Sequence, residues 1–233
     1  MFDMVFDTML EGVMKNTAVK ITIREPGSAV THFIGLVLAA AASIPLITKA
    51  SNEPAGHVPA FLVYALSLIL LYGASTAYHT FDLSQKINTI LKKLDHMMIF
   101  VLIAGSYTPV CMTVIGGRTG RILLAVIWIM AAAGIIVKGF FVFCPKWFSS
   151  VLYIGMGWTC IVCLKTIIQN LPPAAFGWLL AGGLIYTAGG IIYALKLPVF
   201  DGRHKNFGSH EIFHLFVLGG SLCHFIFLYA FVL

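Results

Sequence analysis

The feature that most constrains this chain's fold is a series of seven long apolar runs, separated by short stretches that hold most of the charged residues. Each run is long enough to cross about 30 Å of hydrocarbon as an α-helix, which rises about 1.5 Å per residue. The runs lie near residues 28–48, 58–80, 95–115, 120–142, 148–168, 174–195 and 210–232. The sequence therefore predicts an all-α integral membrane protein, a bundle of seven transmembrane helices.

Composition supports one membrane domain, expected over residues 26–233. Apolar residues make up 59% of the chain and charged residues 10%, and the mean hydropathy of +0.93 is far above that of soluble domains. The net charge of +6 is spread over the stretches between the runs. This spread argues against a nucleic-acid-binding face and favours anionic lipid headgroups as the partner.

The segment before the first run, residues 1–25, is too rich in charged residues for a signal peptide. Its apolar residues recur at helical spacing, which predicts a short helix in the headgroup layer, with a disordered tail as the alternative. These residues are Phe2, Val5, Phe6, Met9 and Val13.

The distribution of Lys and Arg predicts the orientation of the chain. With seven spans, eleven of these residues fall on the side of the N-terminus and four on the other side. Positively charged residues concentrate on the cytoplasmic side of membrane proteins. We therefore expect a cytoplasmic N-terminus and an extracytoplasmic C-terminus.

Proline, glycine and cysteine suggest further details of the bundle. Pro109 lies inside the third run, where we expect a kink. The pairs 182–183 and 189–190, like Gly155 and Gly157, should let helices approach closely. We interpret the five cysteines as small buried hydrophobic residues; they are Cys111, Cys144, Cys160, Cys163 and Cys223.

Polar residues from three separate runs are predicted to lie at one depth of the membrane, near its cytoplasmic boundary. They are Ser75 and His79 at the end of the second run, Asp95 at the start of the third, and His210 and His214 at the start of the seventh. Polar groups in a membrane interior are costly unless they have a use. Any one of them alone could be an interfacial or packing residue, but their coincidence indicates a site.

The residue types at this depth favour a metal ion. His210 and His214 are four residues apart, which on a helix places both rings on one face about 6 Å apart. With His79 they could supply three nitrogens to zinc and leave a fourth position for water. Copper, iron or nickel would also accept imidazole ligands. Asp95 is then the candidate general base, and Ser75 could bind substrate or support a ligand.

The remaining histidines are weaker candidates. His32, near the start of the first run, could support a ligand from behind. His224 is about 15 Å along the helix from His214, too far to share the ion. His96 should point about 100° away from Asp95 on a helix. His57 and His204 lie between runs.

One alternative follows from the five residues that begin at His210. His210-Glu211-Ile212-Phe213-His214 matches H-E-x-x-H, in which two histidines bind zinc and the glutamate activates water for peptide cleavage. An intramembrane metalloprotease is therefore a hypothesis, but it gives His79 and Asp95 no part.

The wider set of motifs resembles the haemolysin III family, which is grouped with the progestin and adiponectin receptors. The resemblance rests on residues 25–32, which read Glu-Pro-Gly-Ser-Ala-Val-Thr-His, on Ser75-x-x-x-His79, on Leu94-Asp95 and on residues 209–214. It implies a seven-helix bundle with zinc held by His79, His210 and His214. It also implies that Asp95 lies close to the zinc-bound water, and that the chain is of the bacterial type, in the plasma (inner) membrane.

Three functions remain open at this point. The family is similar to alkaline ceramidases, so a zinc-dependent hydrolase of a lipid amide or ester is the first hypothesis. The second is membrane permeabilisation, the activity for which the family is named, with zinc as a structural clamp. The third is a non-enzymatic sensor of membrane state.

Overall fold

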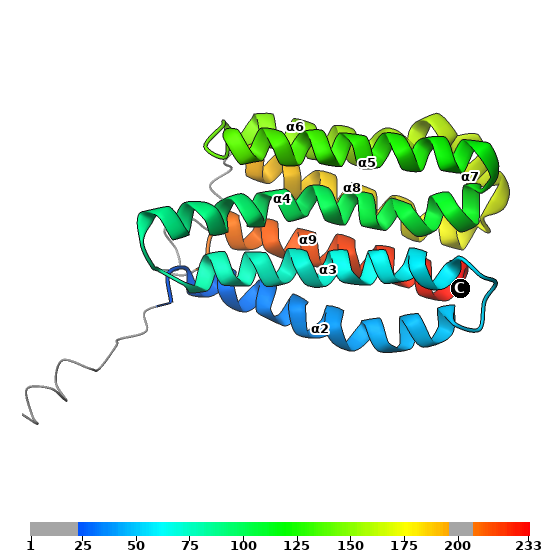
Figure 1. Cartoon of the computed structure of the whole chain (residues 1–233), viewed down its shortest axis with the longest axis horizontal. Coiled ribbons are helices and arrows are strands. Elements are labelled where there is room, and N and C mark those ends of the chain that lie inside the picture. Colours follow the sequence, from blue (N-terminus) through cyan, green and yellow to red (C-terminus); the bar gives the residue numbers. More distant parts are fainter. Residues whose placement is uncertain (1–22, 196–206) are drawn as a thin grey trace, which may run out of the picture.

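The computed structural model describes residues 23–195 and 207–233, and in that part of the chain the helices lie side by side as one bundle (Figure 1). Seven helical segments are long and apolar enough to cross a membrane, which confirms the predicted fold class. The predicted interfacial helix falls on residues that the structure does not describe, apart from Ile23, Arg24 and Glu25. The orientation in the membrane stays a prediction.

The seven spans are built from α-helices, some of which pass into tighter or wider helical turns. They are α2 (Pro26–Ala50), α3 (His57–Thr80), α4 (Gln85–Pro109) with the π-helix η1 (Val110–Ile115), α5 (Gly117–Phe140), α6 (Lys146–Gly157) with the 3-10 helix η2 (Trp158–Cys163) and α7 (Leu164–Asn170), α8 (Pro173–Leu195), and α9 (Ser209–Phe227) with the π-helix η3 (Leu228–Val232).

The third span begins earlier than its apolar run predicts, at Gln85 instead of near residue 95. Ser84 caps this helix, because its hydroxyl accepts a hydrogen bond from the Ile87 backbone N–H at 3.4 Å. Lys92 and Lys93 precede the apolar run and mark its N-terminal limit. Lysine is a good helix former, so the helix extends through them. Asp95 therefore lies well inside α4 and not at its start.

Directly after Pro109, α4 passes into the π-helix η1, and the kink expected at this proline stays a prediction. The glycine predictions hold only in part. Gly182 and Gly189 lie against α9, where any larger side chain would collide with His224 or Phe216. An added side-chain carbon at Gly155, Gly157 or Gly183 would meet nothing within 4 Å, so the prediction for these three is wrong.

Helix order sets which parts of the chain meet. α2 packs along α3 and α9, α3 packs against α4, and α8 packs against α9. The end of α3 and the starts of α2, α4 and α9 lie at the same end of the bundle, the left end in Figure 1. This end brings together the polar residues that the sequence singled out.

Candidate metal centre

Three histidines from two helices form a compact cluster. His79 is in the last turn of α3, and His210 and His214 are one turn apart at the start of α9. Each offers one ring nitrogen, and these atoms all lie within 4.8 Å of one another. The ring centroids are 4.6 to 5.1 Å apart. The cluster is compatible with a metal ion bound by three imidazoles.

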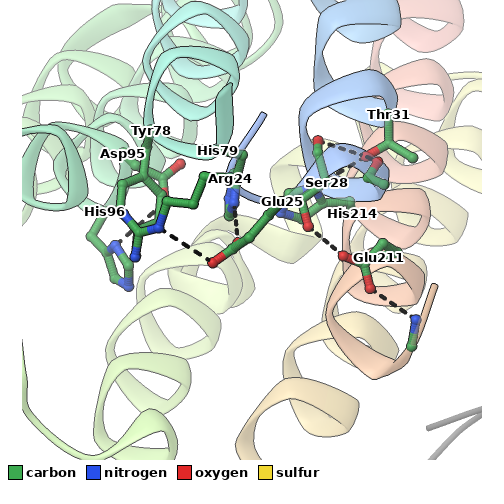
Figure 2. Close-up of polar contacts among 12 residues, drawn as sticks. Arg24, Glu25, Ser28, Thr31, Tyr78, His79, Asp95, His96, Glu211 and His214 are labelled. Carbon is green, nitrogen blue, oxygen red and sulfur yellow. Dashed lines mark hydrogen bonds and ion pairs between the residues drawn. The ribbon is translucent and has the colours of Figure 1, made fainter. Parts of the chain in front are cut away.

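His79 is oriented by a carboxylate that sequence reasoning did not single out. Its Nδ1 donates a hydrogen bond to Oε2 of Glu25 at 2.5 Å (Figure 2). Glu25 is the residue just before the start of α2. The side chain of His79 is 1% exposed, and its Nε2 has no partner among the described residues. The hydrogen bond to Glu25 fixes the ring so that Nε2 presents its lone pair to the cluster.

His214 is oriented in the same way by a hydroxyl. Its Nδ1 lies 3.2 Å from Thr31 Oγ1. The Thr31 hydroxyl donates to the carbonyls of Gly27 and Ser28, so it accepts the hydrogen bond from His214. The Nε2 of His214 is then free to accept. Two of the three histidines thus have the tautomer that a metal requires, and the donor set fits a divalent ion such as zinc.

Backbone contacts hold Glu25 in place. The Glu25 N–H donates to the His79 carbonyl at 2.9 Å, and the Arg24 N–H donates to the Thr80 carbonyl at 3.3 Å. These bonds tie the chain before α2 to the end of α3. The hydrogen bond from His79 is the largest influence on the pKa of Glu25 and, against the opposing effect of burial, holds that pKa below its usual value.

Asp95 and His210 lie at one end of an elongated cavity of about 290 Å³. The polar residues at that end include Asp95, His96, His210 and His214. The rest of the lining is mostly aliphatic and aromatic. It extends to Phe227 and Leu228, near the opposite end of α9. Asp95 is 9% exposed. A long apolar chain with a polar end is the shape of ligand that such a cavity fits.

His96 differs from its prediction, because its Nδ1 lies 3.4 Å from Asp95 Oδ2 instead of pointing away. The same nitrogen is 2.9 Å from the Lys92 carbonyl, to which it donates. His224 also lines the cavity, but it is not part of the histidine cluster. His32 stacks on His214 with ring centroids 3.6 Å apart, and its supporting role stays a prediction.

Ser75 lies one turn before His79 on α3, is fully buried, and its hydroxyl has no hydrogen-bond partner among the described residues. Its assigned role stays a prediction.

Glu25 and Thr31 are the functional residues that sequence reasoning missed. Both lie in or beside the motif at residues 25–32, so the signal was present, but their contacts with the histidines depend on how α2 packs.

Glu211 has a structural role in the described part of the chain. One carboxylate oxygen accepts a hydrogen bond from Ser28 Oγ at 2.5 Å, and the other accepts from the Gly208 N–H at 2.8 Å (Figure 2). The second bond caps α9 and the first ties α9 to α2. Both oxygens of the residue that completes the protease motif are therefore already engaged.

A comparison with known proteins decides the family. The family model described as "Haemolysin-III related" matches residues 21–225, almost the whole chain. This protein belongs to the haemolysin III family. Its relatives include the protein named "Hemolysin-3" of Bacillus cereus, which is 42% identical over 211 residues, covering 90% of this chain and 92% of that protein.

Further relatives of this haemolysin III family member are more distant. The protein named "Hemolysin-3 homolog" of Bacillus subtilis (strain 168) is 38% identical over 206 residues, 88% of this chain and 92% of the relative. The "Adiponectin receptor protein" of Drosophila melanogaster is 25% identical over 221 residues, 86% of this chain and 49% of the receptor. The resemblance drawn from the motifs is thereby confirmed.

Proposed function

We propose that this protein is a zinc-dependent hydrolase that acts on a lipid amide or ester in the plasma membrane of a bacterium. The single observation that carries the proposal is the position of the histidine cluster. His210 and His214 lie at the polar end of a cavity whose remaining lining is mostly aliphatic and aromatic. A lipid whose chain fills the cavity would present its polar linkage to that end.

The residues have separate roles in this proposal. Zinc would be held by His79, His210 and His214, two of which Glu25 and Thr31 orient, and the apolar lining would bind the lipid chain. When bound, zinc would supply a Lewis acid able to polarise a carbonyl and acidify water. Asp95 accepts the proton of the attacking water and later returns it to the leaving group. Ser75 is fully buried and its hydroxyl has no partner among the described residues, so we assign it a supporting role behind the ligand His79, one turn further along α3.

The test is release of fatty acid from a ceramide-like amide and a matching ester, measured by mass spectrometry on protein in lipid nanodiscs. Asp95→Asn should retain zinc and lose about 10²-fold or more in turnover, as expected for loss of a general base. The matched control is Asp82→Asn, because Asp82 is an exposed carboxylate just before the same helix. Full activity of Asp95→Asn would remove Asp95 from the mechanism.

Membrane permeabilisation is the second candidate, and the names of the two Bacillus relatives favour it. In this alternative zinc clamps α3 to α9 and no lipid bond is broken. Dye leakage from vesicles separates the two, because a permeabilising protein would release dye with Asp95→Asn as well as with the wild type. A hydrolase would release fatty acid without dye.

A further inference from the structure

A second polar cluster lies where α5 and α6 meet, apart from the histidines. Lys138, in the last turn of α5, is fully buried, and its Nζ donates hydrogen bonds to Ser149 Oγ of α6 and to Cys144 Sγ at 3.1 Å. Cys144 lies in the loop between the two helices and is half-buried. The sequence-based interpretation of Cys144 as a buried hydrophobic residue is therefore wrong.

The charge of Lys138 needs a counterpart. Over residues 23–195 and 207–233, no carboxylate lies within ion-pair distance of its nitrogen. A buried ammonium without an anion costs several kcal/mol. The thiol of Cys144, 3.1 Å from the Lys138 nitrogen, can become an anion. The other acidic side chain beside Lys138, Tyr153, presents its ring to the nitrogen, with the ring centroid 6.0 Å away.

The hydrogen bonds of the three side chains form a consistent set around a thiolate. Lys138 donates to both Ser149 Oγ and Cys144 Sγ. Ser149 Oγ lies 3.4 Å from Cys144 Sγ, and since it accepts from Lys138, its own proton is free to point at the sulfur. A thiolate at this position would accept one hydrogen bond from each of these two side chains.

The surroundings of Cys144 resemble a lipid-facing edge of the bundle. Its neighbours in sequence include large apolar side chains that are more than half exposed; they are Phe140, Phe141, Phe143 and Trp147. Burial raises the pKa of Cys144, but the hydrogen bonds from Ser149 and Lys138 and the charge of Lys138 outweigh it, so the pKa is lower than usual. An activated thiol thus lies beside the acyl-chain boundary.

We propose that Cys144 is a thiolate that Lys138 and Ser149 stabilise, and that it reacts with hydroperoxides carried by membrane lipids. The sulfur attacks the terminal oxygen of the hydroperoxide. A sulfur–oxygen bond forms, the oxygen–oxygen bond breaks, and the lipid alkoxide leaves and takes a proton from Lys138. The products are a cysteine sulfenic acid and a lipid alcohol.

The expected rate advantage follows from ionisation. An ordinary cysteine is only a few per cent thiolate at pH 7, so full ionisation raises the thiolate fraction by up to about 30-fold. Nucleophilicity falls as the pKa falls, which removes part of that gain. We therefore expect Cys144 to react about tenfold faster in the wild type than in Lys138→Met.

The experiment uses the full chain in nanodiscs, a fatty-acid hydroperoxide, a dimedone-type trap for sulfenic acid, and peptide mass spectrometry. Cys160 is the internal control, because it is the other half-buried cysteine. Cys144 should be labelled faster than Cys160, and both Lys138→Met and Ser149→Ala should slow it. If Lys138→Met does not fold, Ser149→Ala and the comparison with Cys160 carry the test.

The pH dependence gives a readout that a packing role would not change. The titratable groups that influence or face Cys144 from the described helices are Lys138 on α5, Tyr153 on α6 and Tyr193 on α8. Because Lys138 and Ser149 lower the pKa of Cys144, the wild-type rate should level off at a lower pH than the Lys138→Met rate. Equal labelling of Cys144 and Cys160, or no effect of either substitution, would overturn the proposal.

Discussion

Two of the groups of polar side chains buried in the described part of this bundle differ in whether the protein itself satisfies their hydrogen bonds. Near its middle, Tyr72 donates to Ser221 at 2.7 Å, and Tyr186 lies 2.8 Å from the same hydroxyl. At the end where α9 begins, His79 Nε2 and both nitrogens of His32 have no partner in the described residues. The first group is complete without a ligand, and the second is not.

The difference suggests what each group is for. Buried polar groups are nearly always hydrogen-bonded, and in a membrane no water compensates for an unmade bond. The Ser221 group joins α3, α8 and α9 and so contributes to stability. In the histidine cluster, Glu25 and Thr31 hold the Nδ1 atoms of His79 and His214, and the Nε2 of His79 has no partner in the described residues, an arrangement suited to binding a metal.

The largest expected effect comes from removing a histidine of the cluster. His79→Ala should weaken zinc binding by about 10³-fold or more, since a three-ligand site loses one ligand and its fixed geometry. The measurement is competition with a zinc chelator of known affinity. Ser221→Ala is the matched control and should bind zinc as tightly as the wild type. Similar losses of zinc affinity in both variants would show that the two groups do not differ in metal binding.

A smaller effect is expected at Glu25. Glu25→Gln should weaken zinc binding about 10- to 100-fold, because the amide replaces the carboxylate that orients His79 and raises its basicity. The same competition assay measures this loss. Glu53→Gln, in the loop between α2 and α3, provides the control for a lost negative charge. Unchanged affinity in Glu25→Gln would show that the hydrogen bond to His79 has no part in metal binding.

At Ser221 the expected effect is on stability alone. Ser221→Ala leaves the hydroxyls of Tyr72 and Tyr186 without their shared partner, which costs about 1–3 kcal/mol. Thermal unfolding in detergent should show a lower midpoint at unchanged zinc content. A variant that keeps its midpoint but loses zinc would reverse the roles assigned to the two groups.

The smallest effect is expected at Glu211. Glu211→Gln weakens the cap of α9 and the bond to Ser28, at a cost of about 1 kcal/mol. Thermal unfolding again measures it, and zinc affinity should stay close to that of the wild type. Peptide cleavage by the wild type but not by Glu211→Gln would support the protease hypothesis, even though both oxygens of Glu211 are hydrogen-bonded.

The sequence was sufficient for the seven helices, because the length and apolarity of each run follow directly from the thickness of a bilayer. It was also sufficient to bring His79, His210 and His214 to one depth, since helix order fixes which ends coincide. It could not show that Glu25 contacts His79 or that Thr31 contacts His214, because these contacts depend on the rotation of α2 against α3 and α9.

Other differences have local causes. The start of α4 was placed too late because the apolar run begins after lysines that the helix itself accommodates. His96 was expected to point away from Asp95 because ideal helix geometry ignores the reach of two flexible side chains. Cys144 was read as a buried hydrophobic residue, and only the packing of α5 against α6 reveals its contact with Lys138.

The central claim is that the histidine cluster binds a metal through its open nitrogens. The most direct test is to equilibrate the purified wild-type protein with zinc, remove the free ion, count the bound zinc, and examine its donors by X-ray absorption. The claim predicts about one zinc per chain with imidazole nitrogens among its ligands, and its loss in His79→Ala. No zinc in the wild type, or undiminished zinc in His79→Ala, would contradict it.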